Sequence, residues 1–248
     1  CRFVIDTKAR ALTLTDRNRA AIVSDLRSIG SRLGTLVRKS ARDPALQVRE
    51  AAALGGRPFF DPDTRDLVLR LRTLINRIED QQPEVAPFLM IAALRSLVPS
   101  SLLVRRGDLR FRTAAELEGF RPNLVQELRA SIDLVASDLE DLHAVGGEVA
   151  FVCANARSLG ESISAPVDAI ITSPPYLNGT NYFRNTKLEL CFLGHLNSRA
   201  DLRRYRDEAI TAGINDVTLG KTRGGVGVTL PRRLEDTLKN LANAAYDV

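Results

Sequence analysis

Four consecutive residues, Ser173, Pro174, Pro175 and Tyr176, are suited to holding a planar ligand that carries an amino group. Proline fixes φ near about −65° and lacks a backbone N–H, which leaves the carbonyls of this stretch free to face a ligand. The Ser173 hydroxyl and the Pro174 carbonyl can both accept hydrogen bonds from an amino group. The Tyr176 ring offers a flat face for stacking. The sequence therefore predicts a site for the exocyclic amine of a nucleobase.

Two apolar runs are expected to position this turn. Residues 168–171 lead directly into it, and residues 149–153 form a similar run that ends before Asn155. Continuous apolar runs are typical of strands buried in a parallel sheet. Open α/β sheets bind ligands at the carboxyl ends of their strands, so we expect Asn155 and Ser173 to lie at that edge.

The rest of the chain is predicted to be mainly helical. Apolar residues recur at helical spacing from about residue 16 to 37, and Asp61 and Pro62 form a typical helix start. Further helices are predicted at about 87–97, 123–143, 188–196, 201–210 and from about 230, with a short strand at 2–6 that ends in Asp6. Residues 40–58 are predicted to be a loop or a weak helix. We divide the chain into a helical region, 1–146, and a partial catalytic core, 147–248.

Composition excludes several classes of site. The chain has three widely spaced cysteines, Cys1, Cys153 and Cys191, and two histidines, His143 and His195. This argues against a disulfide framework and against a zinc site, so we expect metal-free chemistry in a reducing cytoplasm. Cys153 and Cys191 are interpreted as small buried apolar residues. No apolar run approaches the roughly 20 residues that span a bilayer, so no membrane partner is expected.

The charge is unevenly distributed. Residues 1–130 hold 23 Lys and Arg against 15 Asp and Glu, a balance of +8, whereas the remainder holds 12 against 15. A basic half beside a nearly neutral one fits nucleic-acid binding, although a solvated arginine-rich surface fits equally well. The same two interpretations apply to the basic segment 105–112, which is expected to be a loop.

The motif and its surroundings resemble the S-adenosylmethionine-dependent amino methyltransferases of DNA, which modify cytosine N4 or adenine N6. Their pattern of Asp, Asn or Ser followed by Pro-Pro-Tyr is matched by residues 173–176, and the continuation to Arg184 resembles a bacterial branch of the family. The specific resemblance covers about residues 148–196, with a looser similarity from Phe59 to Arg112. It implies an α/β fold: a partial Rossmann-like core beside a large helical region.

The resemblance also assigns roles. Ser173 and Pro174 would hold the target amino group, and Tyr176 would stack on a base flipped out of double-stranded DNA. Serine in the first position favours cytosine N4 over adenine N6. Asn155 aligns with a family acid that faces the adenine of the cofactor S-adenosylmethionine, and Asp6 with one that binds its ribose.

The family's glycine-rich cofactor loop, Phe-x-Gly-x-Gly, is not found in the sequence. The chain therefore resembles an interior piece or a degraded copy of a longer enzyme, of a kind found in prokaryotic restriction-modification systems. Two alternatives stay open: a methyltransferase of RNA or of protein amides, and a non-catalytic, nucleic-acid-binding remnant.

Overall fold

The computed structural model describes residues 2–55, 58–143, 148–152, 162–163, 165–172 and 185–208, together with the single residues 232, 236, 237 and 240. The chain divides into two units. One comprises Cys1–Pro174 and Thr180–Ala209, and the other Pro175–Gly179 and Ile210–Val248. The first unit contains every helix and strand whose bounds follow.

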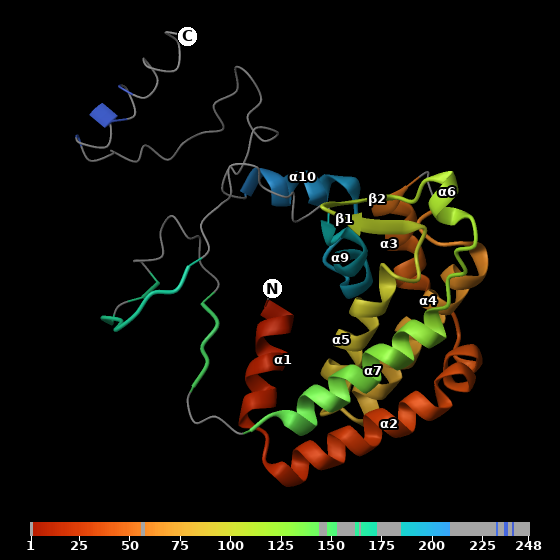
Figure 1. Ribbon diagram of the computed structural model, residues 1–248, viewed down its shortest axis with the longest axis horizontal. Helices are drawn as coiled ribbons and strands as arrows, with labels where there is room; N and C mark the ends of the chain where they lie inside the picture. The colour runs from red at the N-terminus through yellow and green to blue at the C-terminus, as the bar shows by residue number, and fades with distance from the viewer. Residues whose placement is uncertain are drawn as a thin grey trace. The chain divides into compact units, whose positions relative to one another are not determined.

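The first unit is a helical body with one small sheet in its described part (Figure 1). Four helices form its centre: α2 (Asp16–Lys39), α4 (Pro62–Gln81), α5 (Ala86–Leu97) and α7 (Leu124–Asp141). The others are α1 (Arg2–Thr13), α3 (Pro44–Leu54), α6 (Ala114–Leu117), α9 (Lys187–Leu193) and α10 (Arg199–Glu208). The sheet is an antiparallel hairpin of β1 (Leu103–Arg106) and β2 (Asp108–Phe111).

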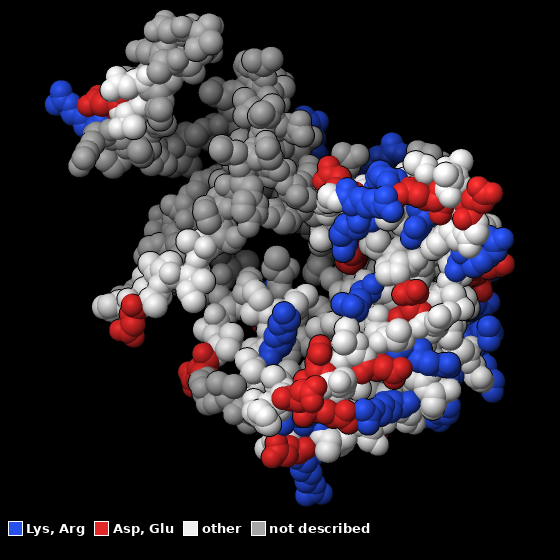
Figure 2. Space-filling model, in the orientation of Figure 1, with Lys and Arg blue, Asp and Glu red and all other residues white. Residues whose placement is uncertain are grey.

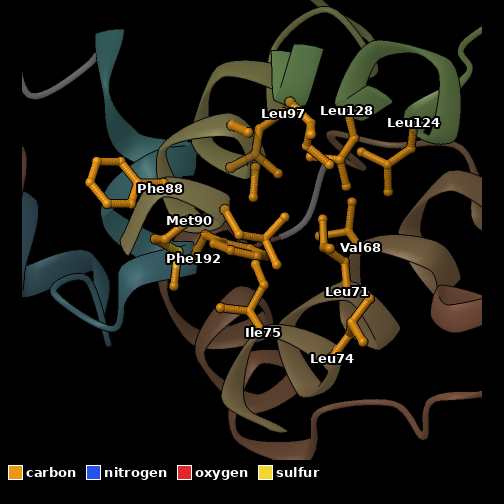
Figure 3. Packing of buried hydrophobic residues seen from close by; sticks show 14 of the residues in the cluster. Val68, Leu71, Leu74, Ile75, Phe88, Met90, Leu97, Leu124, Leu128 and Phe192 are labelled. Carbon is orange, nitrogen blue, oxygen red and sulfur yellow. The ribbon is translucent and has the colours of Figure 1, made fainter. Parts of the chain in front are cut away.

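A continuous apolar core holds these helices together. Leu26 and Leu33 of α2 and Leu128 and Ile132 of α7 are completely buried, and α2 packs along α7. Gly30 of α2 faces α7, since a Cβ at this position would make an ordinary van der Waals contact, 3.5 Å, with the Ile132 side chain. Figure 3 shows apolar side chains of α4, α5, α7 and α9 converging on a shared interior.

Helix starts follow the expected capping chemistry. The Asp61 carboxylate accepts hydrogen bonds from the backbone N–H groups of Asp63 and Thr64, each at 3.1 Å, with Pro62 in the first turn. Thr15 and Asn123 cap α2 and α7 in the same way.

The helices predicted from about 16, 62, 87, 123, 188 and 201 are confirmed as α2, α4, α5, α7, α9 and α10, with ends that differ by a few residues. The segment 40–58 contains a regular helix, α3, whose start is capped by the buried Asp43. Most of the helix predicted from about residue 230 lies outside the described residues.

The predicted strand at residues 2–6 is wrong, because these residues form the first turns of α1. The β-branched Val4 and Ile5 suggested a strand, but Lys8 to Leu12 are mostly good helix formers and extend the periodic pattern. Thr7 and Ala11 are buried on one face, and Phe3 packs beside them. Tertiary burial of this face overrides the local strand preference.

The predicted loop at 105–112 is also corrected, since it forms the β1–β2 hairpin. Gly107, at φ +72°, makes the turn in the left-handed region that glycine tolerates best. Leu103 and Leu109 are buried on the inner face, while Arg105 and Arg106 are exposed.

The two runs predicted as core strands, 149–153 and 168–171, have no regular secondary structure in their described parts, 149–152 and 168–171. Ile170 and Ile171 are 80% and 100% exposed. A parallel strand depends on hydrogen bonds from neighbouring strands, and none of the described residues pairs with these segments. Most of 147–248 lies outside the described residues, so the Rossmann-like core and the division at residue 146 stay predictions.

Replacing Leu128 with alanine should lower the free energy of unfolding by about 2–5 kcal/mol, because the change leaves a cavity between α2 and α7. Leu134, on the same helix but 40% exposed, is the matched control, and its replacement with alanine should cost less than about 1 kcal/mol. Urea unfolding of both variants checks this. Equal losses would contradict the assignment of Leu128 to the core.

Candidate functional site

Asn185 is the first described residue after the Ser-Pro-Pro-Tyr segment, and it binds the β1–β2 hairpin. Its side chain is buried, with 6% of the residue exposed. The amide oxygen accepts a hydrogen bond from the backbone N–H of Leu109, and the amide nitrogen donates to the Asp108 carboxylate at 3.3 Å. The Asn185 carbonyl accepts from the Arg105 guanidinium at 3.0 Å. One asparagine therefore binds both strands of the hairpin.

An ion pair forms a second connection between the hairpin and α9, about one helical turn after Asn185. Arg105 of β1 donates to a carboxylate oxygen of Glu189 in α9 at 3.0 Å. Burial raises the pKa of the Glu189 carboxyl above its usual value, while the charge and hydrogen bond of Arg105 act in the opposite direction. The other carboxylate oxygen of Glu189 is buried and has no hydrogen-bond partner.

Aromatic contacts support the hairpin beside α9. The Phe59 and Phe111 rings stack with centroids 5.3 Å apart. The Lys187 ammonium lies 4.4 Å from the Phe59 ring centroid, within the range of a cation–π contact. Together with Asn185 and Glu189, this stack seats the start of α9 on the hairpin.

Two of the hairpin arginines contact the carboxylate of Glu116 in α6. Arg110 makes two hydrogen bonds to its carboxylate, of 2.7 and 2.9 Å, and Arg106 lies 3.6 Å from it. Glu116 also accepts from the backbone N–H of Thr113 in a capping box. These bonds, led by that of Arg110, lower the pKa of the Glu116 carboxyl to about 2. Figure 2 shows acids interspersed among the basic residues of the face that it presents.

The predicted site residues of the motif, Ser173, Pro174, Pro175 and Tyr176, lie outside the described residues, and so does Asn155. The structure describes the chain on both sides of the motif, at 165–172 and at 185–208.

Asp6 lies in the described part, on the exposed side of α1, where its carboxylate is 3.4 Å from the Arg2 guanidinium. The role of Asp6 as a ribose ligand was predicted from its position at the end of a strand. Because residues 2–6 are helical, that position does not exist.

The described residues also bear on a metal site, a reactive cysteine and a membrane-spanning helix. They contain no group of three or more His, Cys, Asp or Glu side chains arranged to hold a metal ion. Cys191 is buried, as predicted, and burial followed by the nearby Glu50 charge raises the pKa of its thiol to about 11. A thiol with this pKa is protonated at neutral pH and is a poor nucleophile. None of the described helices is both long and apolar enough to cross a membrane.

Comparison with known proteins finds no matching family model, no matching curated protein and no matching solved structure.

Sequence reasoning missed Asn185 and Glu189. Asn185 stands three residues before the buried Leu188, and Glu189 directly follows it. Polar residues so close to the buried side of a helix require partners. This rule indicates that Asn185 and Glu189 have hydrogen-bond partners elsewhere in the chain. Their partners lie in the β1–β2 hairpin, which is remote in sequence and part of which, 105–112, the sequence predicts as a loop.

Replacing Asn185 with alanine should destabilise the chain by about 1–3 kcal/mol, because the buried Leu109 N–H loses its acceptor. Asn197 is the matched control: its exposed side chain donates one hydrogen bond to the Gly194 carbonyl, so Asn197→Ala should cost less than about 0.5 kcal/mol. Denaturant unfolding measures both. Equal effects would show that the Asn185 contacts do not hold α9 on the hairpin.

Glu116 should make stability depend on acid pH. Its pKa is lowered from 4.5 to about 2, so its contribution is fully present above pH 4.5 and is lost as the pH falls toward 2. Glu116→Gln should flatten the fall in unfolding free energy over that interval. Glu118→Gln, an exposed neighbour, should leave it unchanged. An unaltered pH slope in Glu116→Gln would contradict the assigned contacts.

Proposed function

We propose that this chain carries the target-base site of an S-adenosylmethionine-dependent methyltransferase that modifies exocyclic amino groups in DNA. The single observation that carries the proposal is the Ser-Pro-Pro-Tyr motif at 173–176 with its continuation to Arg184. Asn185, directly after that continuation, is buried and bound to the hairpin.

The motif residues have separate tasks in this proposal. Ser173 and Pro174 accept hydrogen bonds from the target amino group and orient its lone pair, and Tyr176 stacks on the base. The sulfonium of the cofactor supplies an activated methyl group. Positioning of the amine therefore matters more than a strong base. The serine in the first position of the motif favours cytosine N4 over adenine N6 as the methylated atom. The basic first half of the chain favours double-stranded DNA as the partner. We place the reaction in the cytoplasm.

A second candidate, a non-catalytic nucleic-acid-binding relative of these enzymes, is favoured by one observation. Asp6 lies on an exposed helix and not at a strand end. A chain in which this acid does not face a ribose has one cofactor contact fewer. Equilibrium binding of labelled S-adenosylmethionine to the protein separates the candidates, since the second predicts none.

Transfer of labelled methyl groups to duplex DNA tests the first candidate. Ser173→Ala should slow transfer more than it weakens DNA binding, because serine acts on the reacting amine. Ser162→Ala, at an exposed serine outside the motif, is the control and should keep the full rate. An unchanged rate in Ser173→Ala would remove serine from the site.

Tyr176→Ala should weaken binding of the flipped base by roughly 1–3 kcal/mol through lost stacking, while leaving cofactor affinity intact. Tyr205→Ala, at a partly exposed tyrosine of α10, is the control and should leave both affinities unchanged. DNA and cofactor affinities are measured separately by fluorescence titration. Loss of cofactor binding in Tyr176→Ala would contradict the stacking role.

A further inference from the structure

A groove of about 490 Å³ lies between the end of α5, strand β1, α7 and the start of α9. This volume falls within the roughly 300–1,000 Å³ of ligand sites, so the groove has room for a phosphate together with the sugar that carries it. Its walls combine aliphatic side chains, among them Leu94, Val98 and Val104, with charged ones. The described residues that line the groove all belong to the helical body.

The charged residues of the groove leave a positive surplus. Arg95, Arg105 and Arg112 line it together with two acids, Glu127 and Glu189. Arg105 and Glu189 are paired at 3.0 Å, so their charges offset each other. The other two arginines and Glu127 form no ion pair with any residue in the described ranges. Two unpaired cations against one unpaired anion favour an anionic ligand.

Two of the arginines are held in place before a ligand binds. The Arg112 guanidinium lies 3.8 Å from the centroid of the Phe120 ring. Arg105 uses one terminal nitrogen to donate both to the Asn185 carbonyl and to Glu189. No hydrogen bond within the described part of the chain uses its other terminal nitrogen or the two terminal nitrogens of Arg112. A guanidinium that is already positioned loses less side-chain entropy on binding, and its planar fork matches two phosphate oxygens.

We propose that this groove binds the phosphodiester backbone of a nucleic-acid strand. Arg95, Arg105 and Arg112 contact phosphate oxygens, and the aliphatic residues beside them contact the sugar. Glu127 opposes binding by repulsion. Phosphate contacts carry no sequence information, so binding through the groove is independent of base sequence. The choice of DNA as the nucleic acid rests on the proposed function, whereas binding itself needs neither the methyl donor nor residues 173–176.

Fluorescence anisotropy of a short labelled duplex with the full chain, without methyl donor and over a series of salt concentrations, tests the phosphate contacts. Arg95→Gln should weaken binding at least about threefold, and should make the fall of log affinity with log salt concentration shallower by about 0.9, the value of one phosphate contact. Arg17→Gln removes an exposed charge of α2 outside the groove and is the matched control, which should keep the salt slope. Equal changes in the two variants, or no binding by the unaltered protein, would overturn the inference.

A variant of the groove acid should act in the opposite direction. Glu127→Gln removes the repulsion of the phosphate and should strengthen binding at least about twofold, a gain that partial unfolding cannot produce. Glu79→Gln, at an exposed acid of α4 outside the groove, is the control and should leave the affinity unchanged. An unchanged or weaker affinity in Glu127→Gln would place the DNA elsewhere on the chain.

Competition with inorganic phosphate separates a strand from a free anion. A strand contacts the groove through several linked phosphates, so inorganic phosphate should displace the duplex no better than chloride of equal ionic strength. Displacement by phosphate well beyond that of chloride would assign the groove to the free anion and contradict the inference.

Methyl transfer measured on the same variants keeps this inference apart from the proposed function. Binding that depends on Arg95, without any methylated product, supports the groove and contradicts the proposed function. Methylation of DNA by a protein whose affinity is unchanged in Arg95→Gln supports the proposed function and overturns the groove.

Discussion

The attachment of α9 to the β1–β2 hairpin is the constraint that joins two parts of the helical body remote in the sequence. Asn185 uses its side-chain oxygen, side-chain nitrogen and carbonyl for this attachment, and the Arg105–Glu189 pair adds a charged contact. A buried amide with all these groups satisfied has one favourable orientation. The chain therefore enters α9 at a defined place on the hairpin.

The hairpin can serve as this platform because its own arginines are compensated. Glu116 binds Arg110 and Arg106 at one end, and Arg105 is bound by α9 at the other. Self-repulsion in a segment with so many arginines is thereby reduced. The Nε of Arg112 and one carboxylate oxygen of Glu189 are buried without hydrogen-bond partners.

Much of the helical body followed from the sequence, because periodic apolar residues and caps such as Asp61 and Asn123 are local signals. The sequence does not predict the hairpin, because its strands are short and rich in arginine. The prediction of a strand at 2–6 is wrong because the buried residues that favour the helix, Thr7 and Ala11, lie beyond this short segment. The Ser-Pro-Pro-Tyr motif is local in sequence and was found easily. Asn185 was not, because its importance depends on partners that only the folded chain brings close.

The most direct test of the central claim is the identity of the methylated product. The protein is incubated with duplex DNA and S-adenosylmethionine, and the DNA is digested to nucleosides and analysed by mass spectrometry. We expect N4-methyldeoxycytidine, which disappears in Ser173→Ala. Bound cofactor with no methylated nucleoside, or methyl groups found on RNA or protein in place of DNA, would contradict the account.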